Sequence, residues 1–353
     1  MVFYNREDDI RRMKAVLSGD PNLLYFVYGP INSGKTALLM KVLEELPEEY
    51  RVFYINFRGI ETRSYEDFIH TIFDVREESL WERVKDGADL LASSLKFAED
   101  IMKKFNYSIV LPAEIIERFK PGIRGRKDCF KYLEELMRRV YSKGMRPVLV
   151  FDEIQMLKEV KGNGPVLHDL FNFLVRMTKE THLCHSLCST SDCLFIEDIY
   201  SNARLEGRAK YILVDDLPKD DAFKLYDGFG FNDKELVWDW IGGKVGDMVR
   251  LYEEKKQGYN EEEGLKSMLK DEIGRLEWIR WKVLRKVEDG SGIWEFLKKF
   301  RNEDRLTKEE IGEEFDRLIF WIEQNILFYN PVESTIGPQS RLLWRAIREV
   351  IKN

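Results

Sequence analysis

Cysteine is scarce in this sequence, with four residues in a chain of 353. So few cysteines exclude a disulfide framework as the source of stability, and they are typical of a reducing compartment. No apolar run approaches the ~20 residues that cross a bilayer, and the charged N-terminus lacks the apolar segment of a signal peptide. We therefore expect a cytoplasmic protein that does not contact a membrane.

Basic residues are not in excess either. The formal net charge is −7, with both signs mixed along the chain, which argues against a surface built throughout for binding nucleic acid. The length exceeds the roughly 250–300 residues at which a single hydrophobic core stops growing. Two or three domains are therefore expected.

A glycine-framed loop follows the first apolar run, in the sequence NLLYFVYGPINSGKT at 22–36. The spacing fits the phosphate-binding P-loop, and its place between an expected strand and an expected helix argues against a chance match. Lysine can reach the β- and γ-phosphates, and the threonine hydroxyl can ligate Mg²⁺. The residues expected to hold a nucleotide here are Gly29, Pro30, Ile31, Asn32, Ser33, Gly34, Lys35, Thr36 and Ala37.

Two carboxylates follow a second apolar run, because Asp152 and Glu153 come directly after the expected strand at 147–151. In an open parallel sheet, ligands bind at the edge formed by the carboxyl ends of the strands. Asp152 is expected to hold Mg²⁺, and Glu153 to orient and deprotonate an attacking water. A nonfunctional acidic turn is the alternative, but the P-loop upstream favours a catalytic pair.

Polar residues occur beside two later expected strands. Ser189 and Thr190 end the strand expected at 181–190, where they could touch a γ-phosphate or the attacking water. Arg204 and Arg208 precede the strand expected at 211–214. An arginine beside a nucleotide can stabilise transition-state charge, whereas an arginine in a loop is often only solvated. The residues alone leave these two readings of Arg208 open.

In this order, the motifs resemble an AAA+-type ATPase, and more narrowly the archaeal ATPase family within the STAND class of signal-transducing NTPases. The most specific stretches are NREDD (5–9), GPINSGKT (29–36), VLVFDEIQ (148–155) and ILFYNPVESTIGPQSRLLWRAI (326–347). The resemblance implies that Asn5, which replaces the family's glycine, and Arg6 contact adenine. It also implies that Ser189 or Thr190 is the first sensor, and that Arg208 is an arginine finger acting in cis or across a subunit contact.

The family fold implied by the resemblance is α/β, with a P-loop AAA+-type parallel sheet core over 1–218 that carries a helical insert at about 77–141. A helical lid over 219–290 and a C-terminal winged-helix domain over 291–353 follow. The lid segment Gly242-Gly243-Lys244-Val245 resembles a Gly-Gly-x-Pro motif, with Val245 at the proline position. Arg250 is a candidate second-sensor cation.

The expected function is a nucleotide-controlled switch that binds ATP or ADP with Mg²⁺, hydrolyses ATP slowly, and contacts a protein partner or a second copy. Two alternatives stay open: an ATPase acting on nucleic acid, such as a DNA-binding loader or mobile-element accessory protein, and a small-molecule P-loop kinase. Four acidic residues on the third helix of the expected winged helix disfavour DNA, namely Glu313, Glu314, Asp316 and Glu323. The tryptophans and basic residues at 278–286 are expected to form one face of a lid helix rather than a nucleic-acid stripe.

Overall fold

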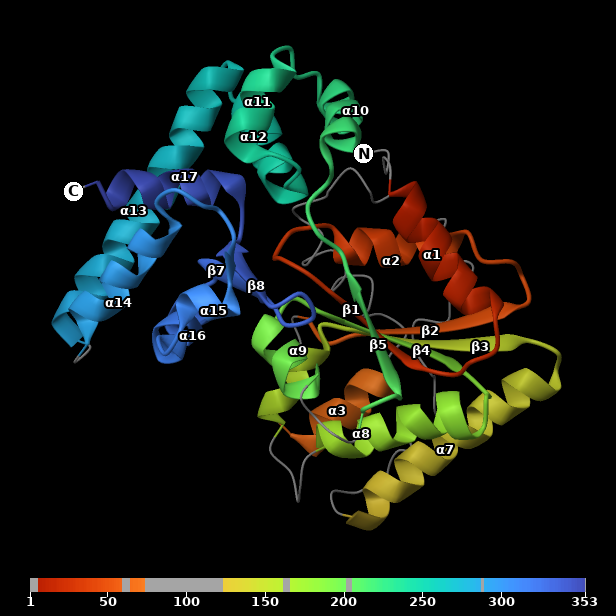
Figure 1. The fold of residues 1–353 in the computed structure, drawn as a ribbon. Helices are drawn as coiled ribbons and strands as arrows, with labels where there is room; N and C mark the ends of the chain where they lie inside the picture. Colours follow the sequence, from red (N-terminus) through yellow and green to blue (C-terminus); the bar gives the residue numbers. More distant parts are fainter. Residues whose placement is uncertain are drawn as a thin grey trace.

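The computed structural model describes residues 6–58, 64–73, 123–160, 166–200, 205–286 and 289–352. Asn5 and residues 77–122 of the expected insert lie outside the described residues. Figure 1 shows a core built on one twisted sheet, a group of helices above it, and a C-terminal unit beside it. Within the described part of the chain, no helix is both long and apolar enough to cross a membrane.

The core sheet has five parallel strands in the order β2-β3-β4-β1-β5. Nearly every residue of the middle three is buried, because helices cover both faces of the sheet. The strands expected before the P-loop and at 147–151, 181–190 and 211–214 are present, within a few residues of their expected bounds. The five strands are β1 (Leu24–Tyr28), β2 (Tyr50–Asn56), β3 (Arg146–Asp152), β4 (His185–Thr190) and β5 (Ala209–Leu213).

Helices α1 (Glu7–Ser18) and α2 (Lys35–Glu44) cover one face of the sheet, and other core helices cover the opposite face (Figure 1). The first pair buries side chains such as Leu17 and Leu38 against strand residues such as Val150. On the opposite face, Phe68, Leu133 and Leu170 are buried in a cluster that includes strand aromatics. The core helices are α1 (Glu7–Ser18), α2 (Lys35–Glu44), α3 (Tyr65–Ile72), α7 (Ile123–Ser142), η3 (Ile154–Glu159), α8 (Val166–Val175), η4 (Arg176–Glu180) and α9 (Cys193–Tyr200).

The next group of helices is joined to the core by a close backbone contact. The Leu217 N–H donates to the Gly243 carbonyl at 3.0 Å, and a Cβ added at Gly243 would lie 1.8 Å from the Leu217 carbonyl oxygen. A side chain at Gly243 would therefore push the two segments apart. These helices are α10 (Lys219–Phe229), α11 (Lys234–Ile241), α12 (Val245–Lys256) and the long α13 (Glu261–Lys286).

Helix α13 belongs to two hydrophobic clusters. Leu265 and Met268 in its first half pack with α10, α11 and α12, whereas Leu276, Ile279 and Val283 in its second half pack with α14 and α17. We call α10, α11, α12 and the first half of α13 the lid, after the expected name for this region. Helix α13 therefore runs from the lid into the C-terminal unit.

The C-terminal unit contains a three-stranded antiparallel sheet in the order β6-β8-β7. Its strands β7 and β8 form a hairpin. Leu306 and Thr307 pair with β8 on its other side. The elements are α14 (Gly290–Phe296), η5 (Leu297–Phe300), β6 (Leu306–Thr307), α15 (Lys308–Ile311), α16 (Phe315–Glu323), β7 (Leu327–Asn330), β8 (Thr335–Pro338) and α17 (Arg341–Val350).

Candidate functional site

The P-loop lies between the carboxyl end of β1 and the amino end of α2. Gly34 caps α2 in the left-handed conformation, with φ 95°. The Lys35 side chain is 6 % exposed, and its Nζ donates to the carbonyls of Gly29 at 3.1 Å and Pro30 at 2.8 Å. Burial lowers the pKa of Lys35 to about 8, although the Glu153 and Asp152 carboxylates act in the opposite direction. The loop is therefore closed around a desolvated cation.

The two carboxylates lie at the same edge of the sheet, as expected. Asp152 Oδ2 accepts from Thr36 Oγ1 at 3.0 Å and from the Tyr54 hydroxyl at 2.6 Å. Glu153 has a left-handed backbone, with φ 56°, and pairs with Arg58 at 2.7 Å between Oε1 and Nη2. Both carboxylates are buried. Asp152 thus faces the P-loop helix, while Glu153 is held by a cation from the segment that follows β2.

A divalent cation fits the oxygen atoms at this point. The Thr36 hydroxyl and the Asp152 carboxylate are hard oxygen ligands that are already in contact. In the loop beside them, the Ser33 hydroxyl is buried and has no hydrogen-bond partner. These residues would suit Mg²⁺ bound together with a phosphate.

Thr190 ends the strand that lies between the P-loop strand and the carboxylate strand. β4 pairs with β1 on one side and β3 on the other, and Thr190 stands opposite Tyr28. Its Oγ1 is buried and accepts from the Asp192 N–H at 3.1 Å. Ser189, one residue earlier, is also buried. Both residues therefore lie in the strand between the P-loop strand and the carboxylate strand, and Thr190 lies at its carboxyl end.

Arg208 lies at the opposite edge of the sheet. It directly precedes β5, its carbonyl accepts from the Leu24 N–H at the start of β1, and its side chain is exposed. Since the P-loop follows the other end of β1, the full length of the strand separates the two. Arg208 therefore does not lie beside its own P-loop in this structure. The expected arginine-finger role, in cis or across a subunit contact, stays a prediction.

Arg6 joins the N-terminal segment to the P-loop. Its Nη2 donates to the carbonyls of Ser33 and Asp215, each at 2.6 Å, and its Nη1 pairs with Asp9 at 3.1 Å. The guanidinium is buried, so it fixes the loop against the segment that follows β5. Asn5, the other expected adenine contact, lies outside the described residues.

The lid contacts the P-loop through Lys244 and Gly246. Lys244 is 3 % exposed, and its Nζ donates to the Ile31 carbonyl at 3.1 Å and pairs with Asp216 at 3.0 Å. The Gly246 N–H donates to the Asn32 carbonyl at 3.2 Å. A Cβ added at Gly246 would lie 2.5 Å from Asn32 Cβ, so only glycine allows this approach.

Arg250 does not bond to the P-loop. Its Nη1 lies 2.7 Å from Glu272 on α13 and 3.5 Å from Asp247 on its own helix. The candidate second sensor is thus paired between two helices, and Lys244 is the lid cation that the structure places at the loop.

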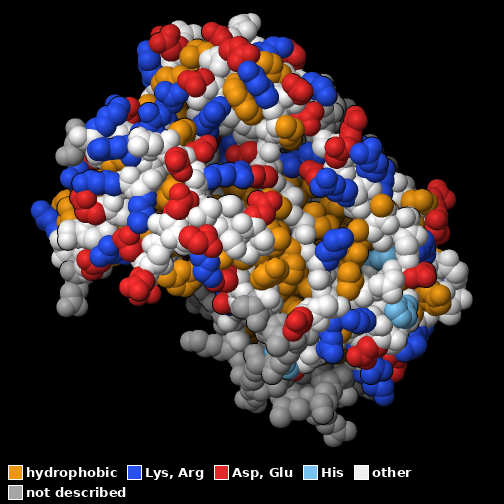
Figure 2. All heavy atoms as spheres, in the orientation of Figure 1, with side chains coloured by type: hydrophobic (Ala, Val, Ile, Leu, Met, Phe, Trp, Pro, Cys, Tyr) orange, Lys and Arg blue, Asp and Glu red, His pale blue; other side chains and the backbone are white. Residues whose placement is uncertain are grey.

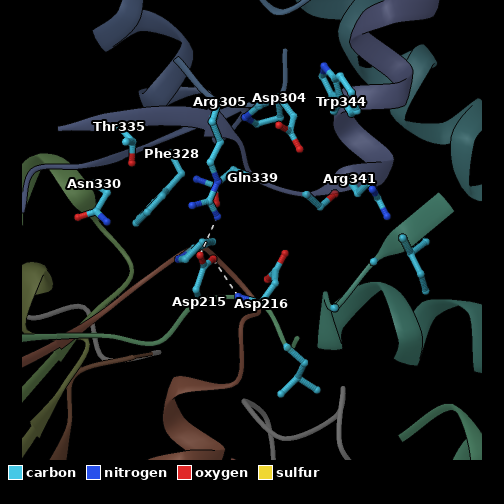
Figure 3. Close-up of a pocket in the computed structure, with 18 of the residues that line it drawn as sticks. Asp215, Asp216, Asp304, Arg305, Phe328, Asn330, Thr335, Gln339, Arg341 and Trp344 are labelled. Atoms are coloured by element: carbon cyan, nitrogen blue, oxygen red, sulfur yellow. Dashed lines mark hydrogen bonds and ion pairs between the residues drawn. The ribbon is translucent and has the colours of Figure 1, made fainter. Parts of the chain in front are cut away.

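The C-terminal unit also bonds to the P-loop strand and loop. Gln339 Oε1 accepts from the Ile31 N–H at 3.0 Å, and the Tyr28 hydroxyl donates to Asn330 Oδ1 at 2.7 Å. Arg305 pairs with Asp215 at 2.8 Å. A cavity of about 310 Å³ lies at this boundary, lined by Asp215, Asp216, Arg305, Asn330 and Gln339 among others. Figure 3 shows Asp215 and Asp216 opposite Arg305 and Gln339 of the C-terminal unit.

Sequence reasoning missed Lys244, Gln339 and Tyr54 as site residues. Lys244 stood inside the lid motif and Gln339 inside the C-terminal motif, so both segments were identified without a role for these side chains. Tyr54 gave no signal, because an aromatic residue in a buried strand is ordinary. Only the packing of distant segments brings the three side chains to the loop.

Comparisons with known proteins find matches to both parts of this chain. Residues 3–251 match the family described as an ATPase domain predominantly from Archaea, and residues 262–351 match the C-terminal domain of uncharacterized ATP-binding proteins like MJ1010. The chain is 39% identical to the uncharacterized ATP-binding protein MJ0075 of Methanocaldococcus jannaschii. It is 35% identical to the uncharacterized ATP-binding protein PYRAB09480 of Pyrococcus abyssi. Each comparison covers 99% of both chains.

Solved structures share the fold at lower sequence identity. The Walker-type ATPase PABY2304 of Pyrococcus abyssi is similar with a TM-score of 0.62 and 16% identity, over 98% of this chain and 96% of that one. The ORC2 protein of Aeropyrum pernix, solved with ADPNP and ADP, is similar with a TM-score of 0.50 and 12% identity, over 98% and 92%. Because the family match covers residues 3–251 of this chain, more than half of its length, the chain belongs to the ATPase domain family found predominantly in Archaea.

Proposed function

We propose that this protein binds ATP with Mg²⁺, hydrolyses it slowly, and uses the nucleotide to control how the lid and the C-terminal unit sit on the core. One observation carries the proposal: the P-loop is bonded at once by Arg6, by Lys244 of the lid and by Gln339 of the C-terminal unit. A change in the loop must therefore change contacts with all three segments. We further propose that residues 291–353 form a winged-helix unit.

The residues of the site would divide the chemistry among them. Lys35 would leave the loop carbonyls and neutralise the β- and γ-phosphates, and Thr36 with Asp152 would hold the cation. Mg²⁺, when bound, would supply further charge neutralisation at the phosphates. Glu153 would take a proton from the attacking water, with Thr190 orienting that water or the γ-phosphate. Arg6 and Lys244 would close the nucleotide against the loop.

Competition for hydrogen-bond donors would link the nucleotide to the C-terminal unit. In the structure, Lys35 Nζ donates to loop carbonyls and the Ile31 N–H donates to Gln339. Phosphate oxygens accept the same kinds of bond, and a charged acceptor makes the stronger one. Bound ATP would therefore draw donors away from Gln339 and weaken the contact with the C-terminal unit. The reverse effect, weaker ATP binding while the contact is intact, follows by linkage.

Three observations support this proposal over the alternatives. Relatives that align over the whole chain carry the name ATP-binding protein, and the carboxylate pair suits water activation better than transfer to an acceptor. The exposed acidic residues of α15 and α16 disfavour DNA as the substrate.

The direct test measures binding and turnover separately. ATP–Mg²⁺ binding to the full chain is followed by calorimetry, and free phosphate is followed over time against any phosphorylated acceptor, with and without DNA. We expect binding and slow phosphate release, and for Glu153→Gln retained binding with release reduced by roughly 100-fold, as for loss of a general base. The proposal would be wrong if ATP did not bind. Phosphate that appeared only on an acceptor would exclude hydrolysis. A requirement for DNA in turnover would exclude the nucleotide-controlled switch.

The switch itself can be measured across the contact between core and C-terminal unit. Asp215 and Arg305 pair across it and are partly exposed, whereas the native cysteines are all buried. Cysteines placed at these two positions can therefore be joined selectively by a short bismaleimide. We expect efficient joining without nucleotide and much slower joining with ATP–Mg²⁺ in Glu153→Gln. Equal joining rates in the two states would exclude the coupling.

A further inference from the structure

Helix α13 exposes large apolar side chains on the face opposite its buried one. Leu276, Ile279 and Val283 point into the hydrophobic cluster of the C-terminal unit and are less than 9 % exposed. On the outer face Trp278 is 56 % exposed, Trp281 44 % and Leu284 50 %. Three such side chains within seven residues form an apolar patch, and a patch on a protein surface marks a site of association. The expectation that this stretch is simply a packed lid face is therefore incomplete.

Cations border this patch. The Trp278 and Trp281 rings stack at 5.1 Å between centroids, with 10° between their planes. Lys282 Nζ lies 5.4 Å from the centre of the Trp278 ring, and the Arg285 guanidinium lies 4.6 Å from that of Trp281. We call Trp278, Trp281, Lys282, Leu284 and Arg285 the aromatic–basic face. Figure 2 shows Lys and Arg side chains gathered on the side of the molecule where α13 and α17 lie.

The geometry of the rings bears on the kind of partner. Each tryptophan already packs against the other ring and against a cation, which leaves little ring face for stacking with a nucleic-acid base. The ring edges and Leu284 remain open to apolar contact. The matching partner is therefore a surface that carries carboxylates around an exposed apolar side chain.

Such a surface exists on the same chain, at α15 and α16. Glu309, Glu313 and Asp316 are exposed there, and Phe315 lies among them with 36 % of its surface exposed. Glu314 nearby is already paired with Lys299 and Arg317. We call Glu309, Glu313, Phe315 and Asp316 the acidic face. Because both faces are exposed in one chain, neither covers the other.

We propose that the aromatic–basic face of one chain binds the acidic face of a second copy. Opposite charges would meet around an apolar centre, with Phe315 against the tryptophan edges and Leu284, and carboxylates near Lys282 and Arg285. Both faces belong to the C-terminal unit, so the core and its nucleotide site stay free in the assembly. A two-fold arrangement would use each face once per chain and would close as a dimer.

The experiment measures the mass of the full chain by sedimentation velocity at about 50 mM and about 500 mM salt, because screening at the higher value weakens contacts between exposed charges. We expect assembly at low salt and a shift toward monomer at high salt. Lys282→Glu/Arg285→Glu and, separately, Glu309→Lys/Glu313→Lys should each raise the dissociation constant at least about tenfold. Trp278→Ser/Trp281→Ser should do the same at both salt concentrations.

Mixing the two charge-reversed variants gives the decisive result. The Lys282→Glu/Arg285→Glu variant retains the native acidic face, and the Glu309→Lys/Glu313→Lys variant retains the native aromatic–basic face. These two native faces can bind each other, so an equimolar mixture should assemble although neither variant does alone. The matched control is Lys266→Glu/Lys270→Glu, which makes the same change on exposed residues of the same helix outside the face and should assemble as the wild type does.

Three results would overturn the proposal. A wild-type chain that remains monomeric at low salt would exclude it, as would a mixture that remains monomeric. It would also be wrong if charge reversal left the mass unchanged and instead abolished binding of a fluorescent single-stranded oligonucleotide or of vesicles with anionic lipid. In that case the aromatic–basic face would serve that other partner.

Discussion

The two halves of the candidate site are built differently. The core half consists of the P-loop, Asp152, Glu153 and Thr190, all at the carboxyl ends of adjacent parallel strands. The other half is made by Lys244 of the lid and Gln339 of the C-terminal unit, which come from segments more than two hundred residues further along the chain. The core half is fixed by the sheet, whereas the other half depends on how three units are docked.

This difference indicates a division of labour. Side chains in the core half are held by strand pairing on both sides, and their positions change little unless the sheet unfolds. Contacts in the other half are a few hydrogen bonds and an ion pair, and a neutral hydrogen bond such as that between Ile31 and Gln339 contributes about 0.5–1.5 kcal/mol net. They can be exchanged for bonds to a ligand without unfolding anything. The core half is therefore suited to chemistry and the other half to regulation.

The largest effect on ATP affinity is expected when the cation of the core half is removed. Lys35→Ala should weaken ATP–Mg²⁺ binding by roughly 100-fold or more, because bonds from a charged donor to phosphates contribute about 1.5–3 kcal/mol each. The measurement is calorimetric titration at neutral pH. Lys41→Ala is the matched control, since Lys41 lies on the same helix and pairs with Glu44 and Glu45 on the surface. Wild-type affinity in Lys35→Ala would exclude the P-loop assignment.

The next effect tests the lid. Gly246→Ala places a Cβ 2.5 Å from that of Asn32, so the lid must move away from the loop at a cost of about 1–3 kcal/mol. We expect ATP affinity to fall about 5- to 100-fold while thermal stability changes little. The control is Gly274→Ala, where the added Cβ meets nothing within 4 Å. Equal affinities for the two variants would mean that lid docking does not contribute to the site.

ATP affinity measured as a function of pH compares the protonation state of Lys35 in the free protein with that in the ATP-bound protein. The pKa of Lys35 is about 8 in the free protein because the side chain is buried, and bound phosphates would raise it. ATP affinity should therefore stay constant up to about pH 8 and then fall toward tenfold per pH unit, since binding must take up a proton. The variant Lys35→Arg, which stays charged, should lose this dependence. An ATP affinity that does not change with pH in the wild type would contradict the lowered pKa of Lys35.

The smallest expected effect is a rise in ATP affinity, whereas the changes above lower it. Gln339→Ala removes the bond to the Ile31 N–H and should raise ATP affinity about 2- to 10-fold, the equivalent of one net hydrogen bond. Gln324→Ala, in the same unit but away from the loop, should leave the affinity unchanged. A fall in affinity for Gln339→Ala would show that the C-terminal unit assists the nucleotide instead of competing with it.

Several elements could be predicted because their signals are local. The strand–loop–helix at 22–44, the carboxylates after β3 and the polar end of β4 each follow from residues that are adjacent in sequence. Arg208 could not be placed in the same way. An arginine before a strand lies at the P-loop edge if that strand is antiparallel to β1 and at the opposite edge if it is parallel, and the pairing shows that β5 is parallel to β1.

By itself, the sequence determined the phosphate loop, the neighbouring carboxylates and the parallel α/β core, since these depend on glycine conformation, local spacing and apolar runs. Tertiary structure alone decided that Lys244 and Gln339 reach Ile31, that Arg250 pairs with Glu272, and that Trp278 and Trp281 face outward. The physical reason is that such contacts depend on the relative placement of separately folded units. Burial and pairing across those units leave no local pattern in the chain.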